Sequence, residues 1–94
     1  MSDLAFKWDP RKDALNQEKH GISFEEAKSV FYDENARLIG DPDHSEEEDR
    51  FILLGFSASL RLLAVCHCYR ESESVIGIIS ARKATKSEAR NYPR

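Results

Sequence analysis

The apolar residues in the first third of the chain recur at helical spacing and predict two short helices. Asp9-Pro10 is a helix start, because an acidic residue caps free N–H groups and proline fits the first helical position. Gly21 suits the left-handed conformation that ends many helices, so the first helix is expected over residues 10–20. The second begins at Ser23, which forms a capping-box pattern with Glu26. Its apolar side chains are expected to face the core: Phe24, Ala27, Val30 and Phe31.

Two-residue alternation in residues 4–8, and apolar runs with Leu, Ile, Val and Phe on both faces in the second half of the chain, predict strands. They are expected over residues 4–8, 36–40, 50–57, 61–70 and 74–81. The connections between the last three are short enough for antiparallel hairpins. A final helix is expected from Arg82 or Ala84 to Tyr92, with Pro93 as its stop. The pattern therefore predicts an α+β fold, in which two N-terminal helices pack on an antiparallel sheet of about four strands, followed by a basic C-terminal helix.

Composition limits the class of protein. The chain has 94 residues, 40% hydrophobic and 33% charged, which favours one small folded domain spanning residues 1–94. No apolar run approaches the roughly 20 residues that cross a bilayer, and the first residues do not resemble a secretory signal. On one strand, Cys66 and Cys68 would have Cα atoms about 6.5–7 Å apart, at the limit for a disulfide. A cytoplasmic protein is therefore expected.

The charges are distributed unevenly along the chain. The overall net charge is −3, but residues 1–50 hold 7 basic and 14 acidic side chains, whereas residues 51–94 hold 7 and 3. The last stretch, from Arg82 onward, is the most basic. Such a chain can present one surface to an anion and another to a basic partner. The alternative is that the uneven distribution only reflects where solvent-exposed charges happen to lie along the sequence and has no functional meaning.

Two short motifs resemble metal sites, but neither has the residues or the geometry that a metal ion needs. Residues 41–45 resemble the opening of a calcium loop, but Glu46 stands where glycine is needed and Ile52 where the bidentate glutamate is needed. Cys66-His67-Cys68 resembles a ligand cluster, yet strand alternation sends His67 to the face opposite both cysteines. We therefore expect no metal site, and two cysteines that act as small apolar side chains.

Cationic and hydrogen-bonding groups on the last two strands and the final helix are the remaining candidates for chemistry. Such groups suit a phosphodiester, because the planar arginine fork pairs two phosphate oxygens and stays charged. In RNA the 2′-hydroxyl supplies the nucleophile, so the protein need only position the substrate, stabilise charge and transfer protons. An ordinary solvated basic helix is the alternative explanation.

Several blocks along the chain together resemble the BrnT family of toxins. The N-terminal blocks are Phe6-Lys7-Trp8-Asp9, Lys19-His20-Gly21-Ile22-Ser23-Phe24-Glu25-Glu26-Ala27 and Phe31-x-Asp33. The C-terminal blocks are Glu48-Asp49-Arg50, Gly55-Phe56-Ser57, a strand that ends at Arg70, Ile78-Ile79-Ser80-Ala81-Arg82-Lys83-Ala84-Thr85-Lys86-x-Glu88, and Tyr92. The resemblance runs from Phe6 to Tyr92.

The resemblance implies a bacterial type II toxin with a RelE-like α+β fold. Such a toxin is a metal-independent ribonuclease that needs no cofactor and arrests translation. It also implies a hetero-oligomer with a small BrnA-like antitoxin, whose DNA-binding part brings the pair to operator DNA.

The matching positions imply roles for individual residues. Arg70 and Arg82 are the expected contacts to the transition-state phosphate, and His67, with an ordinary pKa of about 6.5, is the expected general acid or base. The expected RNA contacts are Lys83, Lys86, Arg90 and Tyr92. Lys19 and His20 are expected to end the first helix, with a direct role for His20 left open.

One position departs from the family pattern. Where that pattern has Ile-Arg-Ile-Ile-Ser-Ala-Arg, this chain has Ile76-Gly77-Ile78-Ile79-Ser80-Ala81-Arg82, so Gly77 replaces an arginine. One hypothesis is a weakened or inactive toxin. The other is that the charge has moved elsewhere, for example to Arg61 or Arg70.

A second class of function stays open beside the ribonuclease. The chain could be a non-catalytic module that holds the antitoxin and tunes repression of the operon. A general RNA-binding domain has less support, because most Phe and Trp residues fall on core-facing positions and only Tyr69 and Tyr92 are placed to stack on bases.

Overall fold

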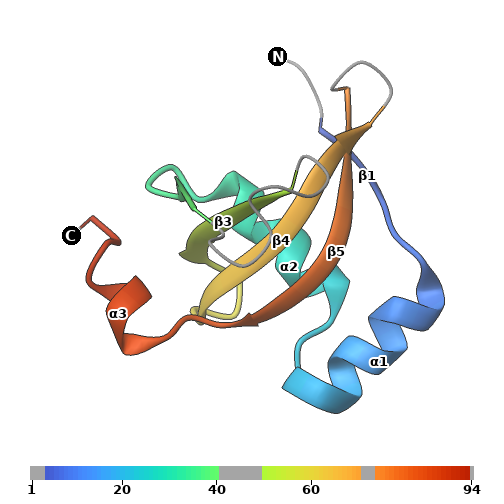
Figure 1. Cartoon of the computed structure of the whole chain (residues 1–94), viewed down its shortest axis with the longest axis horizontal. Coiled ribbons are helices and arrows are strands. Elements are labelled where there is room, and N and C mark those ends of the chain that lie inside the picture. The colour runs from blue at the N-terminus through green and yellow to red at the C-terminus, as the bar shows by residue number, and fades with distance from the viewer. Residues whose placement is uncertain (1–3, 41–49, 71–73, 94) are drawn as a thin grey trace.

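The structure of the chain is a computed structural model that describes residues 4–40, 50–70 and 74–93. The turn at residues 41–45, the acidic run after it and the connection at 71–73 lie outside the described residues. The elements are β1 (Ala5–Lys7), α1 (Pro10–His20), α2 (Phe24–Ser29), the 3₁₀ turn η1 (Val30–Tyr32), β2 (Arg37–Ile39), β3 (Phe51–Phe56), β4 (Leu62–Arg70), β5 (Val75–Lys83) and α3 (Lys86–Ala89). Figure 1 shows their arrangement.

The described strands form one five-stranded sheet in the order β1-β5-β4-β3-β2. The α+β class is confirmed, but two details of the sequence prediction are wrong. The sheet has five strands rather than about four, and it is mixed rather than antiparallel, because β1 pairs with β5 in parallel. This pairing joins the first strand of the chain to the last. Nothing local in a three-residue strand specifies such a distant partner.

The predicted helix boundaries of α1 are confirmed by their capping groups. The Asp9 carboxylate accepts a hydrogen bond from the Arg11 N–H at 2.9 Å, and Pro10 is the first helical residue. Gly21 ends the helix with a φ of 70°, in the left-handed region that favours glycine. Its N–H donates to the Gln17 carbonyl at 2.8 Å.

The start of α2 agrees with the predicted cap in one respect only. The Ser23 hydroxyl accepts from the Glu26 N–H at 3.0 Å, as a helix cap requires. The Glu26 carboxylate, however, points away from the cap and toward Ser57 and Arg61. The serine and glutamate spacing therefore marked the helix start correctly, while the glutamate serves a contact across the molecule.

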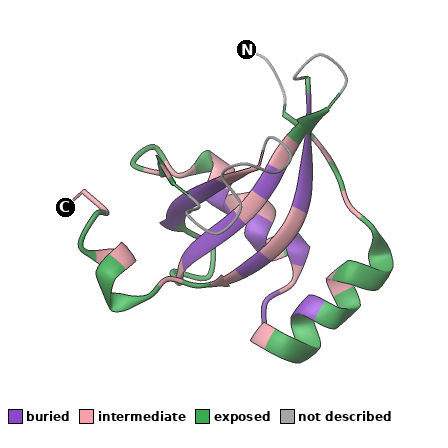
Figure 2. Cartoon of the chain, in the orientation of Figure 1, coloured by how far each residue is buried: buried purple, intermediate pink, exposed green. Residues whose placement is uncertain are grey.

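The main core lies between α2, η1 and one face of the sheet, which we call the helix-covered face. Phe24 and Ala27 of α2 are fully buried there, as the helical spacing predicted. The cluster comprises Ile22, Phe24, Ala27, Val30, Leu53, Leu63, Val65, Ile78 and Ala81. Figure 2 shows this buried band running through α2 and the central strands, whereas α1 is largely exposed.

A single buried amide attaches α1 to the sheet. Asn16 is the buried residue of this helix, all of whose residues are described. Its Nδ2 donates to the carbonyls of Ile22 at 2.8 Å and Ala81 at 2.9 Å, and its Oδ1 accepts from the Ala81 N–H at 3.1 Å. Because β1 pairs with β5 only as far as Gly77, the amide takes the place of a neighbouring strand at Ala81.

The C-terminal helix is shorter than predicted. The structure overturns a helix from Arg82 or Ala84 to Tyr92, because β5 continues to Lys83 by pairing with β4. The helix α3 covers only Lys86–Ala89, where Thr85 and Glu88 form a complete capping box. The basic residues of this stretch are therefore divided between a strand and one helical turn.

Replacing Asn16 by alanine should destabilise the fold strongly. Asn16→Ala removes three hydrogen bonds and leaves the N–H and C=O of Ala81 without them, so we expect the free energy of unfolding to fall by about 2–4 kcal/mol. Urea denaturation measures it. Gln17→Ala, on an exposed position of the same helix, is the control and should change it by less than about 0.5 kcal/mol. Equal effects of the two variants would show that the buried amide does not hold α1.

Candidate functional site

The second face of the sheet, opposite the helix-covered face, holds the candidate site. Residues paired across neighbouring strands lie on the same face, and Gly77 pairs with Cys68 on β4 and with Lys7 on β1. Strand alternation places Arg70 on this face too. At Cys66 and His67 the register shifts, because consecutive residues of β4 pair with Ser80 and Ile78 and leave Ile79 as an extra residue.

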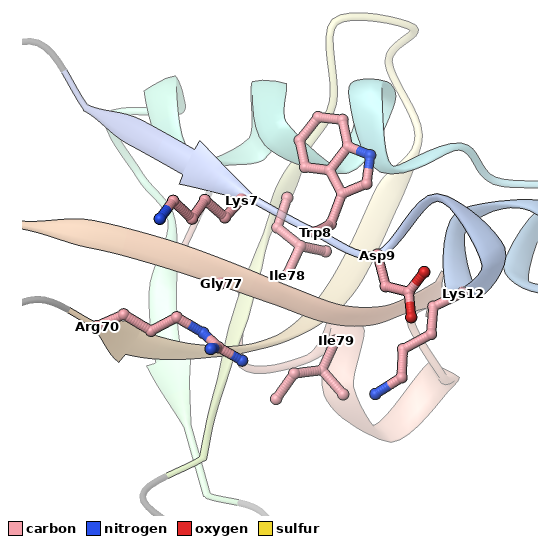
Figure 3. Close-up of a pocket in the computed structure, with 8 residues that line it drawn as sticks. All are labelled: Lys7, Trp8, Asp9, Lys12, Arg70, Gly77, Ile78 and Ile79. Carbon is pink, nitrogen blue, oxygen red and sulfur yellow. The ribbon is translucent and has the colours of Figure 1, made fainter.

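Arg70 lines a pocket of about 280 Å³ where β1, the start of α1 and β5 meet. The lining residues are Lys7, Trp8, Asp9, Lys12, Arg70, Gly77, Ile78 and Ile79. Three of them are cations and one is an acid, whose carboxylate already caps α1. In Figure 3 the Arg70 guanidinium and the Lys12 amino group lie on the same side of β5. We call this the Arg70 pocket; its charge suits an anion.

Arg70 lies against the backbone of Gly77. A Cβ atom built on Gly77 would come within 2.7 Å of the Arg70 Nε and 3.0 Å of the Cys68 Sγ. Any side chain at position 77 would therefore force Arg70 to move. Arg61 is the other arginine to which the charge could have moved. It lies just before the start of β4, at the opposite end of the strand from Arg70, and pairs with the Glu26 carboxylate. Of these two arginines, Arg70 is the one beside Gly77.

His67 lies on the helix-covered face, away from Arg70. It faces away from the two cysteines, as strand alternation predicted, and it is fully buried. Its ring packs edge-on against Phe31, with ring centroids 4.8 Å apart. Nδ1 lies 3.1 Å from the Val65 carbonyl, which can only accept, so Nδ1 carries the proton. Nε2 then accepts from the Tyr69 hydroxyl at 3.3 Å. Burial lowers the pKa of His67, so the ring is neutral.

Arg82 lies far from Arg70 and is held by a carboxylate. Its two terminal nitrogens donate to the two oxygens of Glu88 at 2.7 and 2.8 Å. This pairing, assisted by Thr85, lowers the pKa of Glu88 to about 2. Arg82 pairs with Ala64 and Arg70 with Val75, so the two arginines are about 20 Å apart along the strands. They do not meet at one phosphate.

The four expected RNA contacts are spread over the C-terminal end. Lys83, Lys86 and Arg90 are exposed on the end of β5, on α3 and just after α3. Tyr92 is half-buried, and its hydroxyl donates to the Asp33 carboxylate at 2.7 Å. This bond raises the pKa of Tyr92. The ring also packs edge-on against Phe56, so Tyr92 joins the end of the chain to β3 and η1.

Sequence reasoning missed two groups of polar residues. It placed the cations at the C-terminal end and overlooked Lys7 and Lys12. Lys7 is brought to the Arg70 pocket by the pairing of β1 with β5, and Lys12 by the position of α1 beside β5. It also missed the Glu26 carboxylate as a partner of Ser57, at 2.6 Å, and of Arg61. The hydrogen bond from Arg61 lowers the pKa of Glu26. The capping-box spacing at Glu26 was the signal available, and it pointed to a different bond.

No group of three or more His, Cys, Asp or Glu side chains in the described part of the chain is placed to hold a metal ion. Cys66 and Cys68 are half-buried, and no disulfide joins these two described residues. Among the described residues, no helix has both the length and the apolar content that crossing a bilayer requires.

Residues 8–88 match the family model described as the ribonuclease toxin, BrnT, of type II toxin–antitoxin systems. The chain belongs to the BrnT family. The fold agrees with the crystal structure of the Brucella abortus ribonuclease toxin BrnT, with a TM-score of 0.67, 22% sequence identity, and coverage of 89% of this chain and 100% of that one. No curated protein gives a significant match. Membership of a BrnT family of type II toxin–antitoxin systems implies an antitoxin partner.

The neutral His67 should make this BrnT-family protein sensitive to mild acid. Because the folded state lowers the pKa of His67, the stabilisation is complete above a pH of about 6.5 and is lost as the pH falls below it. We expect urea denaturation to show this loss as the pH is lowered from about 7. His67→Phe should remove the pH-dependent part, whereas the control His20→Asn should retain it. A loss that persists in His67→Phe would assign it to another group.

The Arg82 and Glu88 pair should contribute stability that disappears in stronger acid. The folded pKa of about 2 is below the ordinary 4.5, so the contribution is present above pH 4.5 and is lost as the pH falls toward 2. Glu88→Gln and Arg82→Gln should each reduce the loss of unfolding free energy that occurs as the pH falls from 4.5 toward 2. The double variant should reduce this loss no further than either single variant does. Additive effects of the two substitutions would show that the residues do not act as a pair.

Proposed function

We propose that this chain is an endoribonuclease that cleaves RNA through attack by the 2′-hydroxyl, without a metal ion or cofactor, with Arg70 at the scissile phosphate. The observation that supports the proposal best is the position of Arg70. Its guanidinium lies over Gly77 in a pocket that Lys7 and Lys12 also line. These cations suit a phosphodiester and the additional negative charge of its transition state.

The proposed reaction needs little covalent chemistry from the protein. The 2′-oxygen forms a bond to phosphorus and loses its proton, while the bond to the 5′-oxygen breaks and that oxygen gains a proton. The products are a 2′,3′-cyclic phosphate and a free 5′-hydroxyl. Arg70 pairs two phosphate oxygens with its planar fork and stabilises the dianionic transition state, and the two lysines add positive charge around it.

The proposal gives different roles to the three residues expected to be catalytic. Arg70 contacts the phosphate. His67 is fully buried on the other face of the sheet, so it acts as a positioning residue that orients the Tyr69 hydroxyl. Arg82 positions α3 through Glu88. Lys83, Lys86 and Arg90 stay as contacts to more distant parts of the RNA, and Tyr92 as a stacking candidate beside them.

Gly77 is compatible with activity in this proposal. In the family pattern an arginine stands at this position, and here the arginine comes from β4 and lies over the glycine. We therefore propose that Arg70 on β4 supplies the positive charge at this point of the sheet, so that the site keeps a cation without the β5 arginine.

The biological role follows from the family. We propose that cleavage in the cytoplasm arrests translation, and that a BrnA-like antitoxin neutralises the toxin by forming a hetero-oligomer with it. The antitoxin would also bring the pair to operator DNA. A second candidate is a non-catalytic partner of the antitoxin that tunes this repression. It is supported by the missing family arginine, the buried His67 and the pairing of Arg82 with Glu88.

Moving the arginine back to β5 tests the proposal. We expect the wild-type chain to cleave free or ribosome-bound RNA in excess EDTA, and Arg70→Gln to lower the rate by about 10²–10³-fold. The double variant Arg70→Gln with Gly77→Arg should cleave at least about tenfold faster than Arg70→Gln alone, because the new side chain enters the space that Arg70 vacates. Cleavage rates on labelled RNA measure both effects.

Arg11→Gln removes a charge from an exposed position of α1 outside the Arg70 pocket and should leave the rate within about twofold. Thermal unfolding shows that each variant is folded. Wild-type activity in Arg70→Gln would remove Arg70 from the site. Cleavage only by Gly77→Arg would identify a disarmed toxin. If neither wild type nor Gly77→Arg cleaves either RNA, the non-catalytic partner is the better explanation.

A further inference from the structure

A second pocket adjoins the Arg70 pocket along the boundary between α1 and β5. It has a volume of about 200 Å³, and its lining includes Lys12, Leu15, Lys19, His20 and Ile79. Lys12 and Ile79 line both pockets, so the two pockets lie next to each other. Ile79 is the extra residue of the β5 bulge. We call the combined depression the α1–β5 groove.

The groove is basic although the N-terminal half of the chain is acidic. Its charged lining comprises Lys7, Asp9, Lys12, Lys19 and Arg70, with His20 at its far end. The Asp9 carboxylate already accepts the Arg11 N–H. The acids Asp13 and Glu18 of α1 are not among the lining residues. The cations therefore gather along one side of α1, which the overall net charge of −3 conceals.

The groove is also partly apolar. Leu15 is 63% exposed on its rim, and Ile79 lies within it. Asn16 lines the floor, but its amide is already bonded to Ile22 and Ala81. A lining of this kind offers apolar contact to the faces of bases and charge to phosphates, and Ser80 adds a hydroxyl to it.

The groove is longer than a single phosphate group. Lys12 and Lys19 are two helical turns apart on the same side of α1, which is about 10 Å along the axis. The Arg70 pocket extends the groove beyond Lys12. Positive charges at this spacing match a chain of phosphates better than a single small anion.

We infer that the α1–β5 groove binds the single-stranded RNA next to the scissile phosphate, with Lys19 and His20 contacting its backbone beyond the Arg70 pocket. This inference rests on the proposed function, which places the scissile phosphate at Arg70. The strand is unpaired, because attack by the 2′-hydroxyl in line with the leaving oxygen requires a nucleotide that can leave the geometry of a duplex. Lys19 and His20 thereby gain a role besides ending α1.

The test compares binding of a short and a longer RNA. Fluorescence anisotropy measures the affinity of the full chain for 2′-O-methyl oligouridylates, which cannot be cleaved, as a dinucleotide and as a hexanucleotide. We expect wild type to bind the hexanucleotide at least about tenfold more tightly. The double variant Lys19→Gln with His20→Asn should lose most of this gain and reduce the salt slope of hexanucleotide binding by about 0.7 or more, the slope of one phosphate contact.

Two further variants separate the groove from the Arg70 pocket. Arg11→Gln, on the same helix but outside the groove, should retain the gain with length and serves as the matched control. Arg70→Gln should weaken binding of both lengths. If the double variant behaves like Arg11→Gln while Arg70→Gln weakens both, the groove inference fails and the proposed function stands. If only the double variant weakens binding, the groove binds RNA and the proposed role of Arg70 fails.

An acidic protein segment is the competing occupant of a basic groove. A hexaglutamate peptide, with charge comparable to that of the RNA, measures this possibility in the same assay. We expect it to displace the hexanucleotide at least about tenfold less well than unlabelled RNA does, because it lacks bases to contact Leu15 and Ile79. Displacement by the peptide at lower concentrations than by RNA would overturn the inference and assign the groove to a protein partner.

Discussion

The position of α1 depends on the buried amide of Asn16. Almost all of this helix is exposed, so little apolar surface holds it in place, and the hydrogen bonds to Ala81 provide a directional attachment instead. A group buried in this way is costly to leave unpaired, which makes the attachment specific as well as stabilising. Lys12 and Lys19 belong to α1, whereas Arg70 and Gly77 belong to the sheet. The shape of the α1–β5 groove therefore depends on Asn16, which holds the helix against β5.

Many residues that identify the family support the fold rather than the chemistry. Glu26 binds Ser57 and Arg61, which joins α2 to the turn between β3 and β4. Asp33 accepts hydrogen bonds from the Phe56 N–H and the Tyr92 hydroxyl, and so joins η1, β3 and the end of the chain. Position 55, next to Asp33, needs a glycine, because a Cβ atom there would lie 2.9 Å from the Val30 Cγ1. A small domain buries little apolar surface, and such polar contacts supply specificity that the core alone does not.

The sequence predicted those features that depend on neighbouring residues. Gly21 ended α1, the hydroxyl of Ser23 capped α2, and alternation placed His67 opposite the cysteines. It did not predict features that depend on distant contacts. The parallel pairing of β1 with β5 joins segments about seventy residues apart. Basic residues after β5 suggested a site at the end of the chain, but the pocket with three cations lies at β1 and α1, where acidic neighbours in the sequence masked Lys12.

Gly77 and Arg70 form a pair in which the choice at one position restricts the other. The Arg70 side chain occupies the space over β5 that any side chain at position 77 would enter, since even a Cβ there lies within 2.7 Å of its Nε. With an arginine at position 77, the flexible Arg70 side chain would have to take another orientation. Gly77 therefore lets the Arg70 side chain lie directly against the backbone of β5, so that a cation from the neighbouring strand stands at this point on the sheet.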